Sequence, residues 1–390
     1  MSDFKTTLAN KSEIYAVIDR FRAWRLYERY KFAFKGLKII QIIGTNGKGS
    51  TGRFLAQLLR ALNVSVAHYT SPHIFELNER FWQNGEILSD EALNSAHENL
   101  ARTMSEKDIN ALSYFEYATF LAAFAFKECD FIIFEAGLGG EYDATSVFDK
   151  QMSIFTPISY DHTHLLGENL KDIARTKLKV MSQKALISEQ QDELVLNLAQ
   201  KIALLKNATL YKASQIIDEK DKNALNAYEQ KHNLPEFLAN NLCTAFAAFN
   251  LLINSKTKAR KTLQELKKLD LRGRLEQIAP NVFVDVGHNE NAAAALAEHF
   301  KEQKFTLVYN SFADKKIYQI LENLKPIIAK IMLYDYASER ALATKQIKSA
   351  AKALDIECSE FTAIEKDKKY LVFGSFMLAE RFIKEQFEKT

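Results

Sequence analysis

Short apolar runs alternate along this chain with longer segments whose apolar residues recur at helical spacing. The runs are rich in Ile, Val and Phe, and they predict strands at residues 37–43, 64–69, 130–135, 151–156 and 184–188. The segments between and around them predict helices at residues 12–33, 50–62, 90–103, 113–127, 170–182, 190–205, 239–254 and 259–268. Because strand and helix alternate, the pattern indicates a parallel sheet with helices on both faces.

The alternation starts again after about residue 272. Further strands are predicted at residues 281–287, 304–310, 328–336 and 368–374, each followed by helical sequence. A chain of 390 residues is also long for a single hydrophobic core. We therefore predict two α/β domains, a large one at 1–271 and a smaller one at 272–390, with a hinge near Leu269–Gly273.

Composition narrows the class of protein without naming a function. Lys and Arg number 52 against 49 Asp and Glu, and the resulting charge of +3 gives no argument for nucleic acid or a membrane as partner. Three scattered cysteines exclude a disulfide framework and a cysteine-rich zinc site. The N-terminus lacks an apolar signal region, and the longest apolar run, 118–126, is too short to span a membrane. We expect a cytoplasmic monomer that binds small molecules.

A glycine-rich loop directly after the first predicted strand carries the strongest chemical signal. Its glycines let backbone N–H groups face an anion, and the positive end of the next helix points at the same place. Lys48 would reach the β- and γ-phosphates of a nucleotide, and Ser50 or Thr51 would hold Mg²⁺. The alternative is an ordinary turn from strand to helix. The predicted nucleotide-binding residues are Gly44, Thr45, Asn46, Gly47, Lys48, Gly49, Ser50 and Thr51.

This loop refines the predicted fold class. The large domain is expected to be a parallel-sheet domain of the P-loop ATPase type. The repeated strand and helix units after residue 272 predict a smaller Rossmann-like α/β domain at the C-terminus.

Two more polar landmarks lie where predicted strands end. Glu135 closes the run 130–135, so its carboxylate would lie at the carboxyl edge of the sheet, where ligands bind. His162 lies just beyond the run 151–156, between Asp161 and a second histidine, His164. Glu135 could take Mg²⁺ and the histidines could bind a metal. The alternatives are a helix-capping or solvated carboxylate and a structural histidine.

Five motifs follow one another in a fixed order along the large domain. They are GTNGKGST (44–51), YTSPHIFELNER (69–80), SYFEYATFLAAFAF (113–126), FEAGLGGEYDATS (134–146) and YDHTHLLGENLKDIARTK (160–177). In order and spacing they resemble the folylpolyglutamate and dihydrofolate synthases of the Mur ligase superfamily. Segments 272–296, 307–316 and 372–380 extend the resemblance into the smaller domain.

The resemblance implies an ATP-dependent amide ligase. Such enzymes phosphorylate a substrate carboxylate from ATP, and the amino group of L-glutamate then attacks the acyl phosphate to form an amide. The acceptor would be dihydropteroate or a folate, which share the pterin and which these residues do not distinguish. The smaller domain would close on ATP and bind glutamate.

The resemblance also assigns roles residue by residue. Lys48 would bind the β- and γ-phosphates, while Ser50, Glu135 and His162 would hold one or two Mg²⁺ ions. Lys177 matches a lysine that becomes carbamylated in family members, although its neighbours depart from the family's Glu-Lys-Ala-Gly. The alternative for Lys177 is a surface lysine on an amphipathic helix.

Further nucleotide contacts are implied in both domains. Asn241 of the large domain and Arg274, Asp285 and His288 of the smaller one match family residues that contact ATP. If both domains contribute ligands, the ATP site lies between them and domain closure assembles it. The alternative for the smaller-domain residues is a plain strand-to-helix turn in which Asn289 caps the helix.

The folate substrate would contact aromatic and polar side chains in matching loops. A ring could stack on the pterin, although core packing is the alternative for each aromatic residue. The residues assigned to this site are Tyr69, Ser71, Pro72, His73, Phe115 and Asp143, with Tyr142 as a further ring. Glu141 stands where relatives commonly carry Arg, and Phe237-Leu238 stands where they carry a His-Gln pair. We therefore expect the pterin site to be arranged differently here.

Two other functions stay open from the sequence. The chain could be another ligase of the superfamily that couples a different carboxylate to a different amino acid. It could also be a nucleotide-binding regulatory relative that no longer ligates. Such a protein would bind ATP without turnover stimulated by glutamate and an acceptor.

Overall fold

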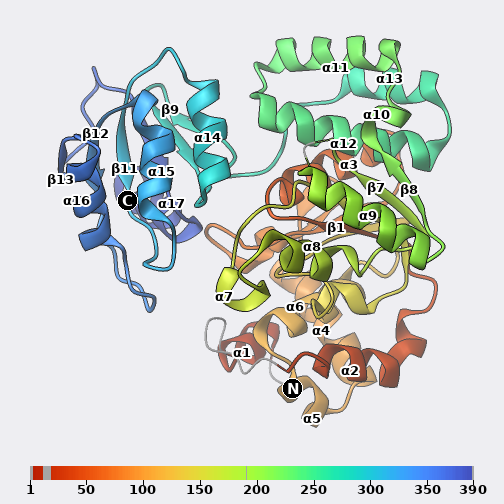
Figure 1. Cartoon of the computed structure of the whole chain (residues 1–390). Coiled ribbons are helices and arrows are strands. Elements are labelled where there is room, and N and C mark those ends of the chain that lie inside the picture. The colour runs from red at the N-terminus through yellow and green to blue at the C-terminus, as the bar shows by residue number, and fades with distance from the viewer. Residues whose placement is uncertain (1–2, 12–18, 190, 389–390) are drawn as a thin grey trace. The chain divides into compact units, whose positions relative to one another are not determined.

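The chain folds into two compact α/β units that divide between Leu269 and Asp270, against a predicted boundary after residue 271. The computed structural model describes residues 3–11, 19–189 and 191–388. The two units, red to green and cyan to blue in Figure 1, each contain their own sheet. The predicted α/β class is confirmed.

The large unit is built on an eight-stranded, mostly parallel sheet. Its strands are β1 (Ile39–Ile43), β2 (Val66–Tyr69), β3 (Phe81–Gln83), β4 (Glu86–Ile87), β5 (Phe131–Glu135), β6 (Lys150–Phe155), β7 (Lys184–Ile187) and β8 (Thr209–Lys212). Their order in the sheet is β4-β3-β2-β5-β1-β6-β7-β8. Only the β2–β3–β4 part is antiparallel. The carboxyl ends of β1, β2, β5 and β6 therefore meet at one edge of the sheet.

Helices cover both faces of this sheet. They are α1 (Phe4–Ala9), α2 (Arg22–Tyr30), α3 (Lys48–Arg60), α4 (Asp90–Thr103), α5 (Glu106–Ala111), α6 (Tyr114–Ala125), α7 (Thr163–Leu166), α8 (Leu170–Leu178), α9 (Glu193–Leu205), α10 (Ala213–Ile216), α11 (Glu219–His232), α12 (Glu236–Ile253) and α13 (Lys256–Glu265). Short 3-10 helices are η1 (Lys31–Phe34), η2 (Leu77–Arg80) and η3 (Ala144–Val147).

The single helix predicted over 12–33 is confirmed in part, because α2 covers Arg22–Tyr30 and η1 continues it from Lys31 to Phe34. Residues 12–18 lie outside the described residues, and the helix α2 begins only at Arg22. The reason is local, because the Asp19 carboxylate accepts hydrogen bonds from the Phe21 N–H (3.0 Å) and from Arg25 Nη2 (2.5 Å). These bonds close a turn ahead of the helix.

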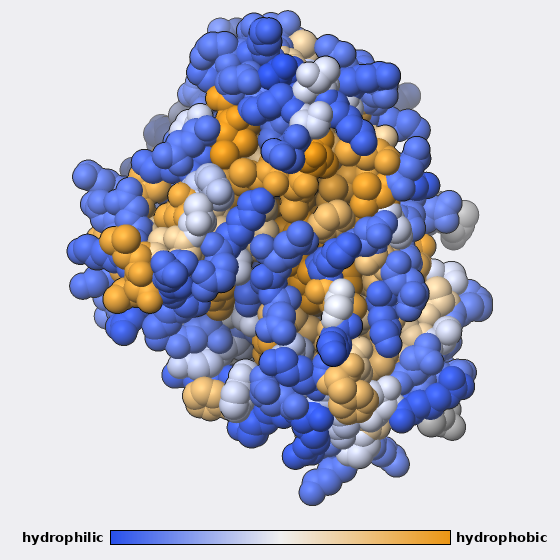
Figure 2. All heavy atoms as spheres, turned by 90° about the vertical axis from the view of Figure 1, so that its right-hand side faces the viewer, coloured by the Kyte–Doolittle hydropathy of each residue, from blue (hydrophilic) through white to orange (hydrophobic). Residues whose placement is uncertain are grey.

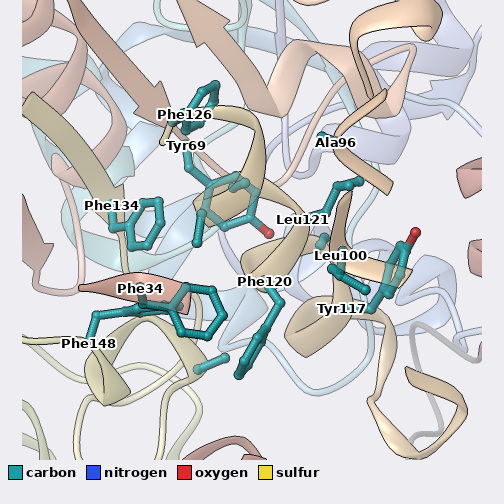
Figure 3. Packing of buried hydrophobic residues seen from close by; sticks show 14 of the residues in the cluster. Phe34, Tyr69, Ala96, Leu100, Tyr117, Phe120, Leu121, Phe126, Phe134 and Phe148 are labelled. Atoms are coloured by element: carbon teal, nitrogen blue, oxygen red, sulfur yellow. The ribbon is translucent and has the colours of Figure 1, made fainter. Parts of the chain in front are cut away.

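Aromatic side chains fill the core beneath α6 (Figure 3). Phe34, Phe120 and Phe148 lie with ring centroids 5.3 to 5.8 Å apart, and Phe134 of β5 lies 5.4 Å from Phe148. On the other face, α3 and α12 pack together in a second core with residues of β1, β5 and β6. Strand β5 is thus buried on both faces, as expected for a central parallel strand.

The small unit contains a six-stranded sheet. Its strands are β9 (Glu276–Ala279), β10 (Val282–Asp285), β11 (Phe305–Tyr309), β12 (Ile328–Leu333), β13 (Cys358–Glu360) and β14 (Tyr370–Phe373), in the order β13-β12-β11-β14-β10-β9. The helices are α14 (Glu290–His299), α15 (Ile317–Leu324), η4 (Lys325–Ile327), α16 (Thr344–Ala353) and α17 (Phe376–Phe387). The four predicted strands form the parallel centre. The edge strands β9 and β13 were not predicted.

One helix among the described residues, α12, is long and apolar enough to cross a membrane by length and composition alone. Burial explains this composition, because α12 packs against α3 and contributes Leu242, Phe246 and Phe249 to the core. The face shown in Figure 2 is mostly hydrophilic, with apolar side chains gathered in smaller areas between the charged ones.

The aromatic core gives a stability prediction. Phe120→Ala removes a fully buried ring and should lower the free energy of unfolding of the large unit by about 3–5 kcal/mol. Both tryptophans, Trp24 and Trp82, lie in this unit, so their fluorescence during urea unfolding reports on it. Phe32→Ala is the matched control, because Phe32 is 72% exposed and its loss should change stability by less than about 0.5 kcal/mol. Equal effects of the two substitutions would contradict this packing.

Candidate active site

The glycine-rich loop is tied to the segment that follows β6. The N–H groups of Thr45 and Asn46 donate to Pro157 O at 2.8 and 3.4 Å. The Thr45 hydroxyl donates to Ser159 O and accepts from the Ser159 N–H, both at 3.0 Å. These N–H groups are therefore already used. The first N–H groups of α3, which have no partner within the helix, are the ones available to a phosphate.

Gly47 and Asn241 fix the start of α3. Gly47 has φ +83°, and a Cβ at this position would overlap Asn241 Oδ1. Asn241 Nδ2 donates to Ser50 Oγ at 3.0 Å, and the Ser50 hydroxyl donates to Gly47 O at 3.4 Å. Helix α3 begins at Lys48, two residues before the predicted start, and Lys48 Nζ donates to Thr45 O at 3.1 Å. The lysine, the serine and the asparagine are thus collected around one turn of backbone.

Glu135 lies beside this loop at the end of β5. It pairs in parallel register with Ile42 of β1, and neighbouring strands are about 4.8 Å apart. Its side chain is buried, and Oε2 accepts hydrogen bonds from the Thr70 hydroxyl and from the Ser71 N–H (3.3 Å). The side chain therefore does not cap a helix, and the solvated alternative is wrong.

Lys177 of α8 reaches the phosphate loop from the other side. Its Nζ donates to Gly44 O at 2.9 Å, and the side chain is buried. Burial, reinforced by the charge of Lys48, lowers the pKa of Lys177 from 10.5 to about 7, while Asp161 and Asp143 oppose this fall. The alternative of a surface lysine is therefore wrong.

His162 lies in the loop after β6 with a left-handed backbone, φ +48°. Its side chain is 36% exposed, and its Nε2 lies 3.6 Å from Asp161 Oδ2. Its N–H donates to Asp161 Oδ1 at 2.9 Å. Within the described ranges no three His, Cys, Asp or Glu side chains cluster closely enough to hold a metal alone. A metal here would need hydroxyl or phosphate oxygens as further ligands.

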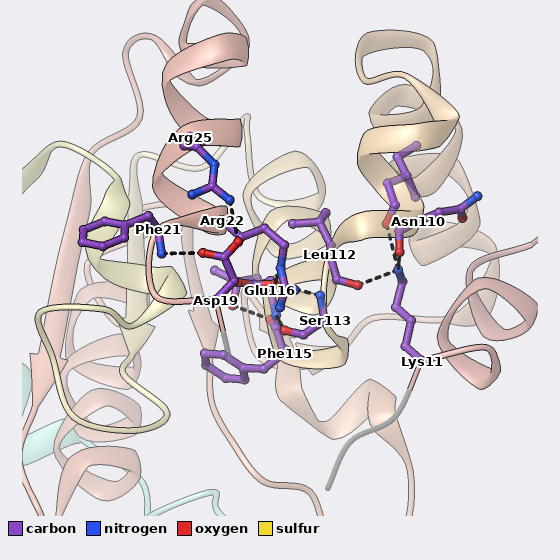
Figure 4. Close-up of polar contacts among 12 residues, drawn as sticks. Lys11, Asp19, Phe21, Arg22, Arg25, Asn110, Leu112, Ser113, Phe115 and Glu116 are labelled. Carbon is purple, nitrogen blue, oxygen red and sulfur yellow. Dashed lines mark hydrogen bonds and ion pairs between the residues drawn. The ribbon is translucent and has the colours of Figure 1, made fainter. Parts of the chain in front are cut away.

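The start of α6, which carries Phe115, is held by polar contacts (Figure 4). Arg22 Nε donates to Glu116 Oε2 at 2.6 Å, and the same oxygen accepts from the Ser113 N–H at 2.7 Å. Lys11 Nζ donates to Leu112 O at 2.8 Å. The ring of Phe115 lies under Gly137, where a Cβ would come within 2.7 Å of its Cζ. Helix α2 thus helps to fix the loop between β5 and η3.

Two of the residues assigned to the folate substrate have other partners. Tyr69 is fully buried against Phe81, Phe115 and Phe134, so the prediction that its ring stacks on a pterin is wrong for this structure. The Asp143 carboxylate accepts four hydrogen bonds from its own loop. They come from the N–H groups of Gly137 (2.9 Å), Leu138 (3.0 Å) and Thr145 (2.9 Å) and from the Thr145 hydroxyl (2.5 Å).

The other residues assigned to the substrate lie in loops near the edge of the sheet. Ser71 and Pro72 are joined by a cis peptide bond directly after β2. Arg80 Nε donates to His73 Nδ1 at 2.9 Å. Tyr142 is 42% exposed, and its ring lies 5.6 Å from that of Phe21.

Sequence reasoning missed Thr70 and Lys179. Thr70 holds the Glu135 carboxylate, and its position inside the motif YTSPH was the signal that could have identified it. Lys179 Nζ donates to both oxygens of Glu141, at 2.7 and 2.8 Å. No pattern along the sequence predicts this contact between Lys179 and Glu141.

In the small unit, Asp285 and Arg274 gather at the end of β10. Asp285 is buried and accepts from the N–H groups of Leu275 (3.0 Å) and Gly287 (2.8 Å). Burial raises the pKa of Asp285, and Arg274 opposes this rise. The His288 Nδ1–H donates to Val286 O at 3.2 Å, and Asn289 caps α14 through the Ala292 N–H. The capping alternative is thus correct for Asn289 itself.

A second polar group at this edge of the small sheet was not predicted. Asn310 follows β11, and its Nδ2 donates to Asp335 Oδ1 (2.8 Å) and to Tyr334 O (3.2 Å) after β12. Arg340 lies 3.7 Å above the Phe312 ring and donates to Asp314 Oδ1 at 2.6 Å. These two polar groups of the small unit therefore both lie at the carboxyl ends of its parallel strands.

Known proteins are similar to this chain in sequence and in fold. The model of the Mur ligase middle domain matches residues 42–253. Dihydrofolate synthase/folylpolyglutamate synthases of Buchnera aphidicola and Haemophilus influenzae are each 30% identical, over 94% and 88% of this chain and 95% and 88% of their own. The crystal structure of Helicobacter pylori folylpolyglutamate synthetase is 40% identical with a TM-score of 0.81, covering 99% of this chain and 98% of that one. The chain therefore belongs to the dihydrofolate synthase/folylpolyglutamate synthase family of Mur ligases.

Proposed function

We propose that this chain uses ATP to join L-glutamate to the carboxylate of dihydropteroate or of a folate, releasing ADP and phosphate. The names of its relatives support this reaction. The observation that carries the proposal is the contact of Lys177 Nζ with Gly44 O, which brings a buried amine with a pKa of about 7 against the phosphate loop. The same loop is joined to Ser159 and so to the segment that carries His162.

The chemistry follows from the poor reactivity of a carboxylate. An oxygen of the acceptor carboxylate attacks the γ-phosphorus, and the bond from this phosphorus to the ADP oxygen breaks. The glutamate nitrogen then attacks the carbonyl carbon, phosphate leaves and the nitrogen loses a proton. Lys48 and the first N–H groups of α3 hold the phosphates during the transfer. The protein thus acts mainly by positioning and charge stabilisation.

The residues present fit a magnesium site. Glu135 uses Oε2 for Thr70 and Ser71, and in the described part of the chain Oε1 accepts no hydrogen bond. Ser50 Oγ is already oriented by Asn241. Ser50, Glu135 and His162 would hold Mg²⁺ together with phosphate oxygens, and His162 must be neutral to do so. The ion would neutralise charge that develops on the transferred phosphoryl group.

Lys177 is proposed to carry a carbamate. The ammonium first loses a proton, the neutral amine attacks CO₂ to form a nitrogen–carbon bond as one C=O π bond opens, and a second proton leaves the nitrogen, so a cation becomes an anion. Burial supports this step, because it lowers the pKa of Lys177 to about 7 and so provides neutral amine at physiological pH. The carbamate oxygens would add ligands for a second Mg²⁺.

The small unit is proposed to contribute Arg274, Asp285 and His288 to nucleotide binding and to receive glutamate. The buried, hydrogen-bonded carboxylate of Asp285 supports a defined role for this loop. The protein is also proposed to be a cytoplasmic monomer. Its scattered free cysteines suit a reducing compartment.

The reaction is tested by isotope transfer. Protein is incubated with Mg·ATP, glutamate and either dihydropteroate or tetrahydrofolate whose carboxylate carries ¹⁸O. We expect ¹⁸O in the released inorganic phosphate for each acceptor that is used, because the acceptor oxygen stays with phosphorus. A different superfamily ligase would leave both acceptors unused. If no ADP forms with either acceptor, the proposal is wrong.

The proposed carbamate predicts a dependence on pH and CO₂. Since the pKa of Lys177 lies near 7, the neutral fraction and the ligation rate should rise as pH increases through 7. Lys177→Ala should lower kcat about 10- to 100-fold, and bicarbonate should not restore it. Lys171→Ala, which removes an exposed lysine of the same helix, is the matched control. Wild-type rates in Lys177→Ala would show that the assignment is wrong.

A further inference from the structure

The half-exposed ion pair between Glu141 and Lys179 joins two segments that are distant in sequence. Lys179 Nζ contacts both carboxylate oxygens, at 2.7 and 2.8 Å, and the side chains are 39% and 30% exposed. Glu141 follows the glycines after β5, and Lys179 is the C-cap residue that directly follows α8. The negative charge of Glu141 is therefore matched by a cation of this chain.

Two further contacts lie next to this pair. The Glu141 N–H donates to Thr176 O at 2.9 Å. Gly140 lies so close to α8 that a Cβ there would come within 2.6 Å of Thr176 O and 2.8 Å of Lys177 Cα. Backbone, packing and charge contacts therefore fix residues 140–141 against the last turn of α8.

Lys177 lies within this fixed turn. Successive residues of an α-helix are about 100° apart, so Lys177 and Lys179 point to different sides of α8. One is buried with its Nζ on Gly44 O, and the other is half-exposed on Glu141. The pair therefore restrains the rotation of the helix from outside, while the amine of Lys177 lies at the phosphate loop.

The end of α8 has a second restraint that does not involve Glu141. Lys206 Nζ donates to Lys179 O at 2.6 Å and to Met181 O at 2.9 Å. These bonds hold the backbone that follows the helix and leave the Lys179 side chain for Glu141. Loss of the ion pair alone should therefore leave α8 folded.

We propose that Glu141 and Lys179 are positioning residues whose ion pair sets α8 so that the Lys177 amine lies at the phosphate loop. The inference rests on the proposed role of Lys177 in glutamate ligation. The ion pair lies on the opposite side of α8 from the Lys177 amine.

The test is a charge swap. Glu141→Lys and Lys179→Glu each place like charges opposite one another, and each should lower the maximal ligation rate about 3- to 10-fold. The double variant Glu141→Lys/Lys179→Glu restores an opposite pair and should recover most of the rate. Lys348→Glu is the matched control, because it breaks a comparable exposed pair with Glu360, 2.7 Å apart in the small unit, and should leave the rate unchanged.

Two readouts separate positioning from other effects. A purely through-space charge effect would move the midpoint of the pH–rate profile in opposite directions in the two single variants, without lowering the plateau. Positioning predicts that both plateaus fall and that the ¹³C carbamate signal formed from labelled bicarbonate weakens in both. Thermal unfolding of all variants verifies that the fold is retained.

The outcomes distinguish this inference from the proposed function. If Lys177→Ala lowers kcat as expected while both single variants keep wild-type plateaus and carbamate signals, only the positioning role is wrong. A double variant that is no better than the single variants overturns it as well. If Lys177→Ala ligates at the wild-type rate, the proposed role of Lys177 is wrong, and the positioning role that rests on it is wrong as well.

Discussion

The backbone of the phosphate loop passes so close to its neighbours that two positions have no space for a side chain. A Cβ at Gly44 would overlap Thr156, and one at Gly47 would overlap Asn241. The loop is thereby held between the end of β6 and helix α12, two elements that are more than 80 residues apart in the sequence. The direction of α3, and with it the first N–H groups that face a phosphate, depends on this fit.

The same close packing extends to the other side of the loop. Gly44 O accepts the bond from Lys177, and Gly140 allows α8 to approach closely enough for that bond to form. Burial then depresses the pKa of the lysine. Because neighbouring strands deliver Glu135 to the same edge through the pairing of β5 with β1, one sheet edge collects a phosphate loop, a carboxylate and an amine that is partly neutral at pH 7.

Much of this edge could be predicted from the sequence, because its signals are local. The run from Ile39 through the glycines, and the carboxylate that ends β5, are each readable within a dozen residues. The strands β3 and β4 were missed because they are short, β8 because it is an edge strand with no buried residue, and α11 because its charged sequence buries few apolar residues. No local pattern distinguishes these from loops.

The errors at the site concern contacts between residues that are distant in the sequence. Tyr69 was expected to face a ligand and is instead buried among rings from three other elements. The hydrogen bond from Lys177 to Gly44 O was not predicted, because the two residues are 133 positions apart in the sequence. The partners of Glu141 and Asn241 likewise depend on the tertiary fold, so the phosphate site was more predictable than its surroundings.

Two glycine substitutions test the central claim that tight packing at the loop creates the nucleotide site. Gly47 and Gly36 have nearly the same φ, +83° and +89°, but a Cβ at residue 36 has no atom within 4 Å. Calorimetric titration with a non-hydrolysable Mg·ATP analogue should show at least about tenfold weaker binding for Gly47→Ala, a loss of roughly 1.4 kcal/mol. Gly36→Ala should bind as the parent does. Equal affinity of Gly47→Ala and Gly36→Ala would contradict the claim.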